Sequence, residues 1–151
     1  MSLLELTADV LSRVRLIAEC YGVELAFDGD GQRGVRVVAH REMLARSLGN
    51  VLFNAIQHGG SSTPVMVQLS IDKEHGVIQV SDGGTPLSDE LRAQAFTAEG
   101  QLVCKGEASG RYSRGLGLFA ACVAADLAGA EVHALAPLRG RNRLEVRARL
   151  A

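Results

Sequence analysis

The sequence REMLARSLGNVLFNAIQH, residues Arg41–His58, carries the clearest structural signal in this chain. Its apolar residues recur at steps of three and four along one side of a helix: Leu44, Leu48, Val51, Leu52 and Ala55. This spacing predicts an amphipathic helix that packs by one face. The following Gly59-Gly60-Ser61-Ser62 is a helix-breaking run, so we expect the helix to end at His58.

Before this helix the sequence predicts another helix and a hairpin. Residues 4–20 place apolar side chains at helical spacing and end before Tyr21-Gly22, which predicts a helix lying on a sheet. The β-rich runs Val23–Phe27 and Val35–Ala39 are separated by the turn-forming residues Asp28–Gly31. We interpret the two runs as a β-hairpin.

After the long helix, two antiparallel strands are expected at Val65–Ile71 and Val77–Val80, then a short helix at Asp89–Phe96. The stretch Thr97–Arg114 is polar, contains glycine and has no periodicity, so it is interpreted as a functional loop. A helix at Leu116–Leu127 follows. Two closing strands, Val132–Leu135 and Arg143–Ala148, complete the chain.

This order of elements predicts an α+β fold, a two-layer sandwich with a mixed, mostly antiparallel sheet and helices on one face. Alternation in Val67-Gln68-Leu69-Ser70 favours a solvated opposite face. The length of 151 residues suits a single domain spanning residues 1–151. Met1, Ser2 and Leu3 resemble the start of an expressed fragment, so we expect the domain to come from a longer protein.

Composition excludes several classes of partner and site. The 16 basic and 17 acidic residues give a net charge of −1, which argues against binding to nucleic acid or to an anionic membrane surface. The three cysteines form no C-x-x-C pair, which argues against a structural zinc site. No stretch is long and apolar enough for a membrane span, so a cytoplasmic domain is expected, although a parent protein could be membrane-anchored.

Three short motifs carry the chemistry, and each has an ordinary structural alternative. Asn50 and Asn54 lie four residues apart on one helix face, where an amide oxygen could complete a Mg²⁺ shell or simply be a solvated polar group. Asp82 ends an apolar strand before Gly83-Gly84, where it could accept a hydrogen bond from the exocyclic amine of adenine or belong to a β-turn. Ser113–Phe119, SRGLGLF, could present free N–H groups to phosphate or be only a glycine-rich helix start.

In this order, from about His40 to Val132, the motifs resemble the N box and the two glycine boxes of the GHKL superfamily. Phe96 stands where the histidine kinases of that superfamily carry the phenylalanine of the F box. The resemblance implies the Bergerat fold, with ATP and Mg²⁺ as cofactors. It also implies that the loop Thr97–Arg114 is an ATP lid.

The resemblance also implies a role for each residue. Asn54 would hold Mg²⁺ through its side-chain oxygen, supported by Asn50, and both count as catalytic residues. Asp82 would read adenine, which Gly84 would allow to approach. Phosphate would be bound by the backbone N–H groups of Gly115, Leu116 and Gly117. The side chain of Arg114 would be a further donor. His58 would flank the nucleotide as a packing or hydrogen-bonding residue.

Asn50 stands where gyrases, heat-shock chaperones and mismatch-repair ATPases carry a glutamate that activates water. A neutral amide cannot act as a general base, so the resemblance is to the catalytic domain of sensor histidine kinases. It implies transfer of the γ-phosphoryl group of ATP to a histidine on a separate dimerisation domain, and onward to the receiver domain of a response regulator. No histidine of this chain has the setting of that acceptor: His40, His58, His75 and His133.

Three positions depart from the family pattern. Gln57 stands in place of a basic residue that contacts phosphate, Pro86 replaces a glycine and Ser113 replaces another. These departures favour an alternative in which the chain is a degenerate GHKL domain that binds nucleotide weakly and acts as a docking or phosphotransfer scaffold. A more distant alternative, an anti-sigma-factor serine kinase, is disfavoured by Asn50.

Overall fold

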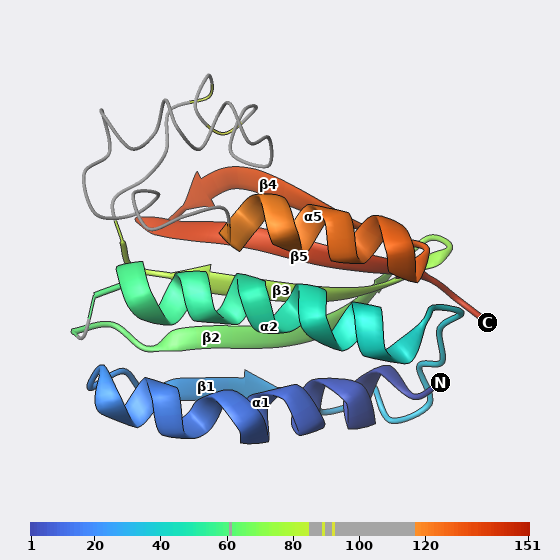
Figure 1. Cartoon of the computed structure of the whole chain (residues 1–151), viewed down its shortest axis with the longest axis horizontal. Coiled ribbons are helices and arrows are strands. Elements are labelled where there is room, and N and C mark those ends of the chain that lie inside the picture. Colours follow the sequence, from blue (N-terminus) through green and yellow to red (C-terminus); the bar gives the residue numbers. More distant parts are fainter. Residues whose placement is uncertain (61, 85–88, 90–91, 93–116) are drawn as a thin grey trace.

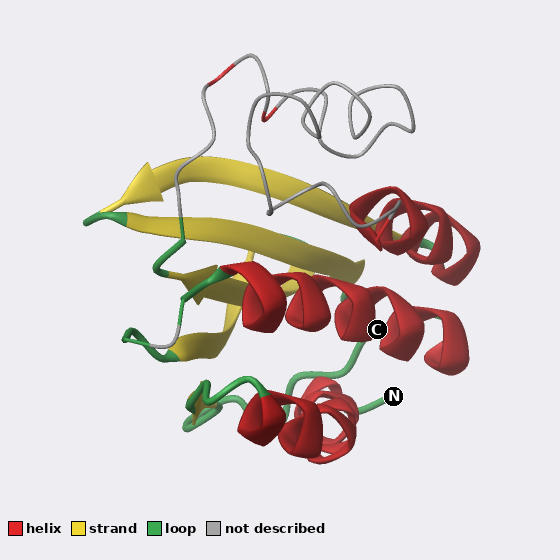
Figure 2. Cartoon of the chain, turned by 60° about the vertical axis from the view of Figure 1, so that its left-hand side comes forward, coloured by secondary structure: helices red, strands yellow, loops and turns green. Residues whose placement is uncertain are grey.

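The computed structural model describes residues 1–60, 62–84, 89, 92 and 117–151 (Figure 1). Helices α1 (Leu3–Cys20), α2 (Arg41–His58) and α5 (Gly117–Ala128) form one layer. The other layer is a five-stranded sheet of β1 (Leu25–Asp28), β2 (Val65–Asp72), β3 (His75–Asp82), β4 (Ala130–Leu138) and β5 (Arg141–Arg149). Figure 2 shows the three helices on one face of the sheet, which confirms the predicted α+β sandwich.

The sheet has the order β1-β2-β3-β5-β4. Strands β2, β3, β5 and β4 pair antiparallel in succession, and only β1 pairs parallel, with Leu25 opposite Val65. The sheet is therefore mixed and mostly antiparallel, as predicted. Strand β3 occupies its centre and ends at Asp82, opposite Asn142 of β5.

The predicted bounds of α2 are confirmed at both ends. His40 precedes the helix as its N-cap, and its Nδ1 accepts a hydrogen bond from the backbone N–H of Met43. The apolar face of α2 is fully buried, with Leu44, Leu48 and Leu52 each at 0% exposure. A helix buried along one whole face is held in a fixed orientation, because turning it would expose several leucines. The polar residues between the leucines are thus fixed as well.

The predicted hairpin of Val23–Phe27 and Val35–Ala39 is wrong. Strand β1 pairs instead with β2, and the segment around Val37 lies between the two chain ends. The Val37 N–H donates to the carbonyl of Met1, and the Val38 N–H donates to that of Arg149. Both predicted runs supply buried side chains. Their hydrophobic pattern therefore reflects burial in the core and not pairing of the two runs with each other.

The other predicted helices and strands are confirmed or lie, at least in part, outside the described residues. Strands β2 to β5 and helix α5 occur where predicted, with each strand longer than expected. In the predicted short helix Asp89–Phe96 only Asp89 and Arg92 are described, and both are helical. The loop Thr97–Arg114 lies outside the described residues. Among the described residues, no helix combines the length and hydropathy that crossing a membrane would require.

Candidate functional site

The ends of α2, β3 and α5 that carry the three motifs lie at one end of the sandwich (Figure 1). The hydroxyl of Ser47 on α2 donates a buried hydrogen bond of 2.7 Å to the carbonyl of Ala121 on α5. The two helices run in opposite directions, so from this bond α2 proceeds toward Asn54 while α5 leads back toward Gly117. Both motifs therefore approach the end of the sandwich where β3 finishes.

Gly59 joins the end of α2 directly to the end of β3. It caps α2, and its N–H donates to the carbonyl of Ala55 at 2.8 Å. A Cβ atom at Gly59 would lie 2.8 Å from the Cβ of Asp82 and would also clash with the Ala55 carbonyl oxygen. Only a residue without a side chain lets the backbone of α2 come this close to Asp82. The helix-breaking glycine of the sequence is thus also a packing requirement of the site.

Asp82 is a buried carboxylate with 2% of its surface exposed. Its Oδ1 accepts a hydrogen bond of 2.9 Å from the backbone N–H of Gly84 and one of 3.4 Å from Nδ2 of Asn142. A buried carboxylate is costly unless hydrogen bonds compensate it, and these two donors also fix its orientation. Asp82 is therefore a preset hydrogen-bond acceptor at the end of the central strand.

Asn54 faces inward at the same end of the sandwich, with 7% of its surface exposed. Its Oδ1 is buried and has no hydrogen-bond partner in the described part of the chain. A buried polar atom without a partner costs roughly 1–3 kcal/mol, so such an atom in a native protein calls for an explanation. Asn50, one turn earlier, is partly exposed. No cluster of three or more His, Cys, Asp or Glu side chains occurs among residues 1–60, 62–84, 89, 92 and 117–151.

The other predicted site residues are placed only in part. Gly117 is the first residue of α5, and Gly84 lies two residues after the end of β3 and donates its N–H to Asp82. His58 is the last residue of α2 and is partly exposed. The remaining predicted phosphate-binding residues lie outside the described residues: Arg114, Gly115 and Leu116. Three other residues singled out from the sequence also lie outside them: Phe96, Pro86 and Ser113.

Two residues of the β4–β5 hairpin reach the site, and neither was predicted from the sequence. Asn142 donates to Asp82, and Arg141 donates to the backbone carbonyls of Pro64 and Ser81 at 2.5 and 2.9 Å. The available signal was the polar, turn-forming run before the final strand. Asp82, which accepts the hydrogen bond from Asn142, lies 60 residues earlier in the chain, however, and the local sequence does not identify it as a partner.

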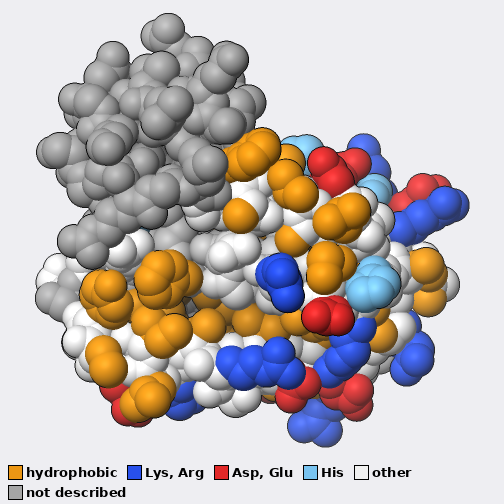
Figure 3. Space-filling model, in the orientation of Figure 1, with side chains coloured by type: hydrophobic (Ala, Val, Ile, Leu, Met, Phe, Trp, Pro, Cys, Tyr) orange, Lys and Arg blue, Asp and Glu red, His pale blue; other side chains and the backbone are white. Residues whose placement is uncertain are grey.

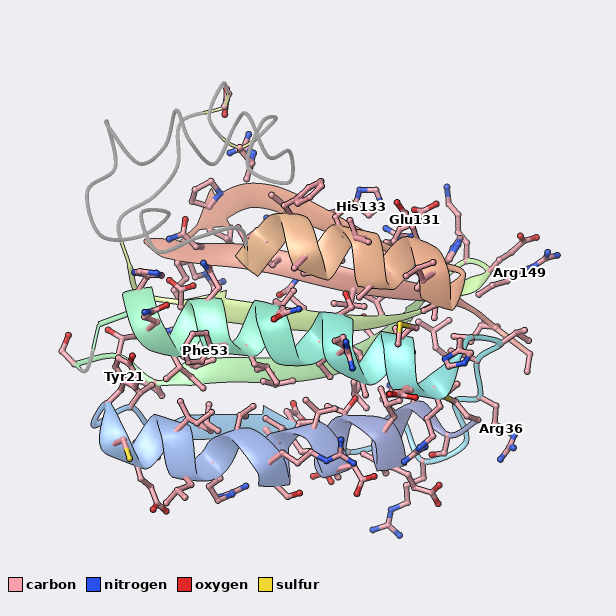
Figure 4. All side chains as sticks on the ribbon, viewed as in Figure 1. Tyr21, Arg36, Phe53, Glu131, His133 and Arg149 are labelled. Atoms are coloured by element: carbon pink, nitrogen blue, oxygen red, sulfur yellow. The ribbon has the colours of Figure 1, made fainter. Side chains whose placement is uncertain are left out.

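Among the described groups, two have shifted pKa values: Cys122 on α5 and Glu131 on β4. Burial raises the pKa of the Cys122 thiol, with a smaller contribution from Asp126. On β4, a hydrogen bond from His133 lowers the pKa of Glu131, and Figure 4 shows this pair far from the end of α2. Glu131 is therefore not placed to take part in chemistry near Asp82.

The helix layer has two further surface features. A groove of about 570 Å³ lies between α1 and the first half of α2, where Gly49 forms part of its wall. Tyr21 and Phe53 make an edge-to-face contact with ring centres 6.4 Å apart, near the ends of α1 and α2 (Figure 4). Figure 3 shows hydrophobic side chains at this end of the helix layer and over α5, with most charged side chains toward the middle and the other end.

Residues 39–150 match the family described as histidine kinase-, DNA gyrase B-, and HSP90-like ATPase. Among curated proteins, the sensor protein CreC of Escherichia coli strain K12 is 33% identical over 84 residues. That alignment covers 56% of this chain and 17% of CreC. The chain thus corresponds to a small part of that longer protein.

Solved histidine kinase structures share the fold. The catalytic domain of histidine kinase ThkA, in a nucleotide-free form, superposes with a TM-score of 0.79 at 19% identity, over 99% of this chain and 94% of that one. The mycobacterial sensor histidine kinase MprB superposes with a TM-score of 0.76 at 20% identity, over 99% and 97% of the two chains. Full-length ShkA in complex with AMPPNP superposes with a TM-score of 0.74 at 21% identity, over all of this chain and 30% of ShkA.

The contact between Gly59 and Asp82 can be tested with two alanine substitutions in the same region. Gly59→Ala should lower the free energy of unfolding by about 1–3 kcal/mol, because the added Cβ overpacks against Asp82. Gly49→Ala is the matched control, since a Cβ there meets nothing within 4 Å. It should raise stability by roughly 0.5–1 kcal/mol through helix propensity. Urea denaturation measures both, and equal effects would show that α2 does not press on Asp82.

Proposed function

The chain belongs to the family of histidine kinase-, DNA gyrase B-, and HSP90-like ATPases, and on this premise we propose that it is the ATP-binding catalytic domain of a sensor histidine kinase. The domain would transfer the γ-phosphoryl group of ATP to a histidine on a separate dimerisation domain. The observation that carries the proposal is the convergence at one end of the sandwich of a buried carboxylate, Asp82, and a buried amide oxygen without a partner, on Asn54.

Asp82 is the proposed adenine-reading group. A carboxylate accepts hydrogen bonds and donates none, so it favours a purine that carries an exocyclic amine at C6, as adenine does. Guanine presents a carbonyl oxygen at that position and would be repelled. The burial of Asp82 supports this role, because a hydrogen bond that forms away from water discriminates more strongly between bases.

Asn54 is the proposed magnesium-binding residue. Its unsatisfied Oδ1 fits a hard cation, which prefers neutral and anionic oxygen atoms as ligands. When bound, Mg²⁺ would neutralise charge on the phosphates of ATP. The described residues offer no cluster of acidic side chains that would hold the ion by themselves, which agrees with a site completed by the phosphates. Gly117, at the start of α5, would present its backbone N–H to a phosphate group together with Gly115 and Leu116.

Asn50 favours phosphoryl transfer over hydrolysis. It lies one turn before Asn54, and its neutral amide cannot take a proton from water. A histidine acceptor brings its own nucleophilic nitrogen, so the domain would only position ATP and balance its charge. The family also contains ATPases, and this residue is what separates the proposed activity from theirs.

The partners follow from the same proposal. The acceptor histidine would come from a dimeric helical domain of the same or another protein, and the phosphoryl group would pass to the receiver domain of a response regulator. The similarity to CreC and to histidine kinase catalytic domains supports this assignment. We further propose that the 151 residues form one domain of a longer kinase, because the alignment with CreC covers only 17% of that protein.

Gln57 favours a second candidate function. It is a partly exposed residue of α2, and it stands where a basic side chain would add a contact to phosphate. Without that charge the domain would bind nucleotide more weakly and serve as a docking or phosphotransfer scaffold. Nucleotide affinity therefore separates the two candidates.

Asp82→Asn should abolish selective binding of a non-hydrolysable ATP analogue. The donors of Gly84 and Asn142 would hold the oxygen of the new amide, so its NH₂ group would face the exocyclic amine of adenine. We therefore expect at least a tenfold loss of affinity in calorimetric titrations with Mg²⁺. Asp126→Asn makes the same chemical change at an exposed position of α5 and should bind like the wild-type chain. If the wild-type chain fails to bind at millimolar nucleotide, the scaffold function is favoured.

Asn54→Ala should separate binding from stability. Affinity for the ATP analogue should fall in Mg²⁺ and stay close to that of the wild type in EDTA, because only the metal-dependent contact is lost. The free energy of unfolding should not decrease, since the substitution removes a buried oxygen that has no partner. A large loss of stability with unchanged affinity in Mg²⁺ would assign Asn54 to the core and not to the site.

The chain incubated with MgATP and no acceptor domain should release phosphate only very slowly. With an amide in place of a general base at position 50, hydrolysis should stay far below the roughly 1–10³ s⁻¹ typical of enzyme turnover. A phosphate-release assay measures this rate. Sustained turnover near 1 s⁻¹, abolished in Asp82→Asn, would identify the chain as an ATPase.

A further inference from the structure

The guanidinium of Arg141 joins the ends of three strands beside Asp82. Its Nη2 donates to the carbonyl of Pro64, directly before β2, at 2.5 Å and to the carbonyl of Ser81 on β3 at 2.9 Å. Its Nε donates to the hydroxyl of Ser81 at 3.2 Å. Arg141 is itself the first residue of β5. One planar side chain thus fixes the spacing of β2, β3 and β5 at the residue before Asp82.

Asn142, the next residue, holds Asp82 from the other side of the sheet. Neighbouring residues of a strand point to opposite faces, so Arg141 reaches Ser81 on one face while Asn142 lies with Asp82 on the other. Asn142 is buried, and its Nδ2 donates to Oδ1 of Asp82 at 3.4 Å and to the carbonyl of Gly84 at 3.1 Å. Arg141 therefore fixes the backbone at the end of β3, and Asn142 fixes the carboxylate of Asp82.

We propose that Arg141 is a positioning residue for base recognition, and that with Asn142 it sets the preference of this domain for a purine bearing an exocyclic amine. The inference rests on the proposed adenine-reading role of Asp82. Arg141 does not touch the base. It holds the Ser81 carbonyl and the start of β2, so that the Asp82 carboxylate keeps the direction in which a hydrogen bond to the amine is short and straight.

The physical reason is the steep dependence of a hydrogen bond on geometry. A bond weakens sharply once its angle is poor, whereas stacking and phosphate contacts tolerate small shifts of the base. Loosening the end of β3 would therefore weaken the contact to the amine more than any other contact of the nucleotide. Base discrimination would fall first, before general nucleotide binding.

Arg143 provides a matched control on the same strand and the same face. Its guanidinium donates to the carbonyl of Ala136 at 2.8 and 3.0 Å, within the β4–β5 hairpin, and among the described residues its side-chain hydrogen bonds do not reach β3. Arg143→Met removes the same charge and the same kind of hydrogen bonds as Arg141→Met. It leaves the connections between β2, β3 and β5 in place.

The experiment compares the Mg²⁺-dependent affinities of the intact chain for ATP and for purine riboside triphosphate, which lacks the exocyclic amine. In Arg141→Met the ratio of the two affinities should fall roughly three- to tenfold, the range that one hydrogen bond accounts for. Arg143→Met should keep the wild-type ratio. Arg141→Lys, which keeps the charge but loses the planar fork, should give an intermediate ratio and serves if the methionine variant does not fold.

An equal loss of affinity for both nucleotides in Arg141→Met, or a lower melting temperature with an unchanged ratio, would overturn the inference, since either result describes a merely structural residue. A reduced ratio in Arg143→Met equal to that in Arg141→Met would overturn it too. If the wild-type chain itself binds both nucleotides equally well, the adenine-reading role of Asp82 fails and the inference falls with it. That result differs from the others because it appears before any substitution is made.

Discussion

The arrangement of this domain depends on the close approach of the Gly59 backbone to the side chain of Asp82. The end of helix α2 packs against the end of the central strand, and a side chain at position 59 would not fit between them. The buried leucines of α2 fix the rotation of the helix, and Gly59 fixes how closely it approaches the sheet. Together they place Asn54 and Asp82 at one end of the sandwich, so a packing constraint becomes the geometry of a candidate nucleotide site.

The buried polar groups of Asp82 and Asn54 at this end differ in their hydrogen bonding. Asp82 is compensated by donors from Gly84 and Asn142, whereas Oδ1 of Asn54 is buried without any partner among the described residues. A protein gains stability when its buried polar atoms form hydrogen bonds. A buried polar atom without such a bond therefore suggests that its partner is supplied by a ligand. This contrast is what makes the amide the proposed metal ligand and the carboxylate the proposed reader of the base.

The family contains both ATPases and kinases, and the fold alone does not separate them. The proposed distinction lies in the side chain at position 50, where an amide replaces a group able to accept a proton from water. The same framework can then serve either chemistry, because the sheet and helices only bring the nucleotide-binding groups together. In this chain the β4–β5 hairpin adds Arg141, whose hydrogen bonds join the strand ends beside Asp82, the proposed base-reading residue.

The sequence by itself determined the elements whose signals are local. The bounds of α2 and the positions of the four antiparallel strands follow from periodicity and glycine, although each strand is longer than predicted. The three motifs followed from their residues and order. Pairings between distant segments were decided by the tertiary structure alone. The turn at Asp28–Gly31 suited a hairpin, yet β1 paired with β2, because the run around Val37 buries its side chains between the chain ends. The hold of Asn142 on Asp82 was likewise invisible in the sequence, since hydrogen bonds between residues 60 positions apart depend on sheet order, and sheet order is set by how the whole core packs.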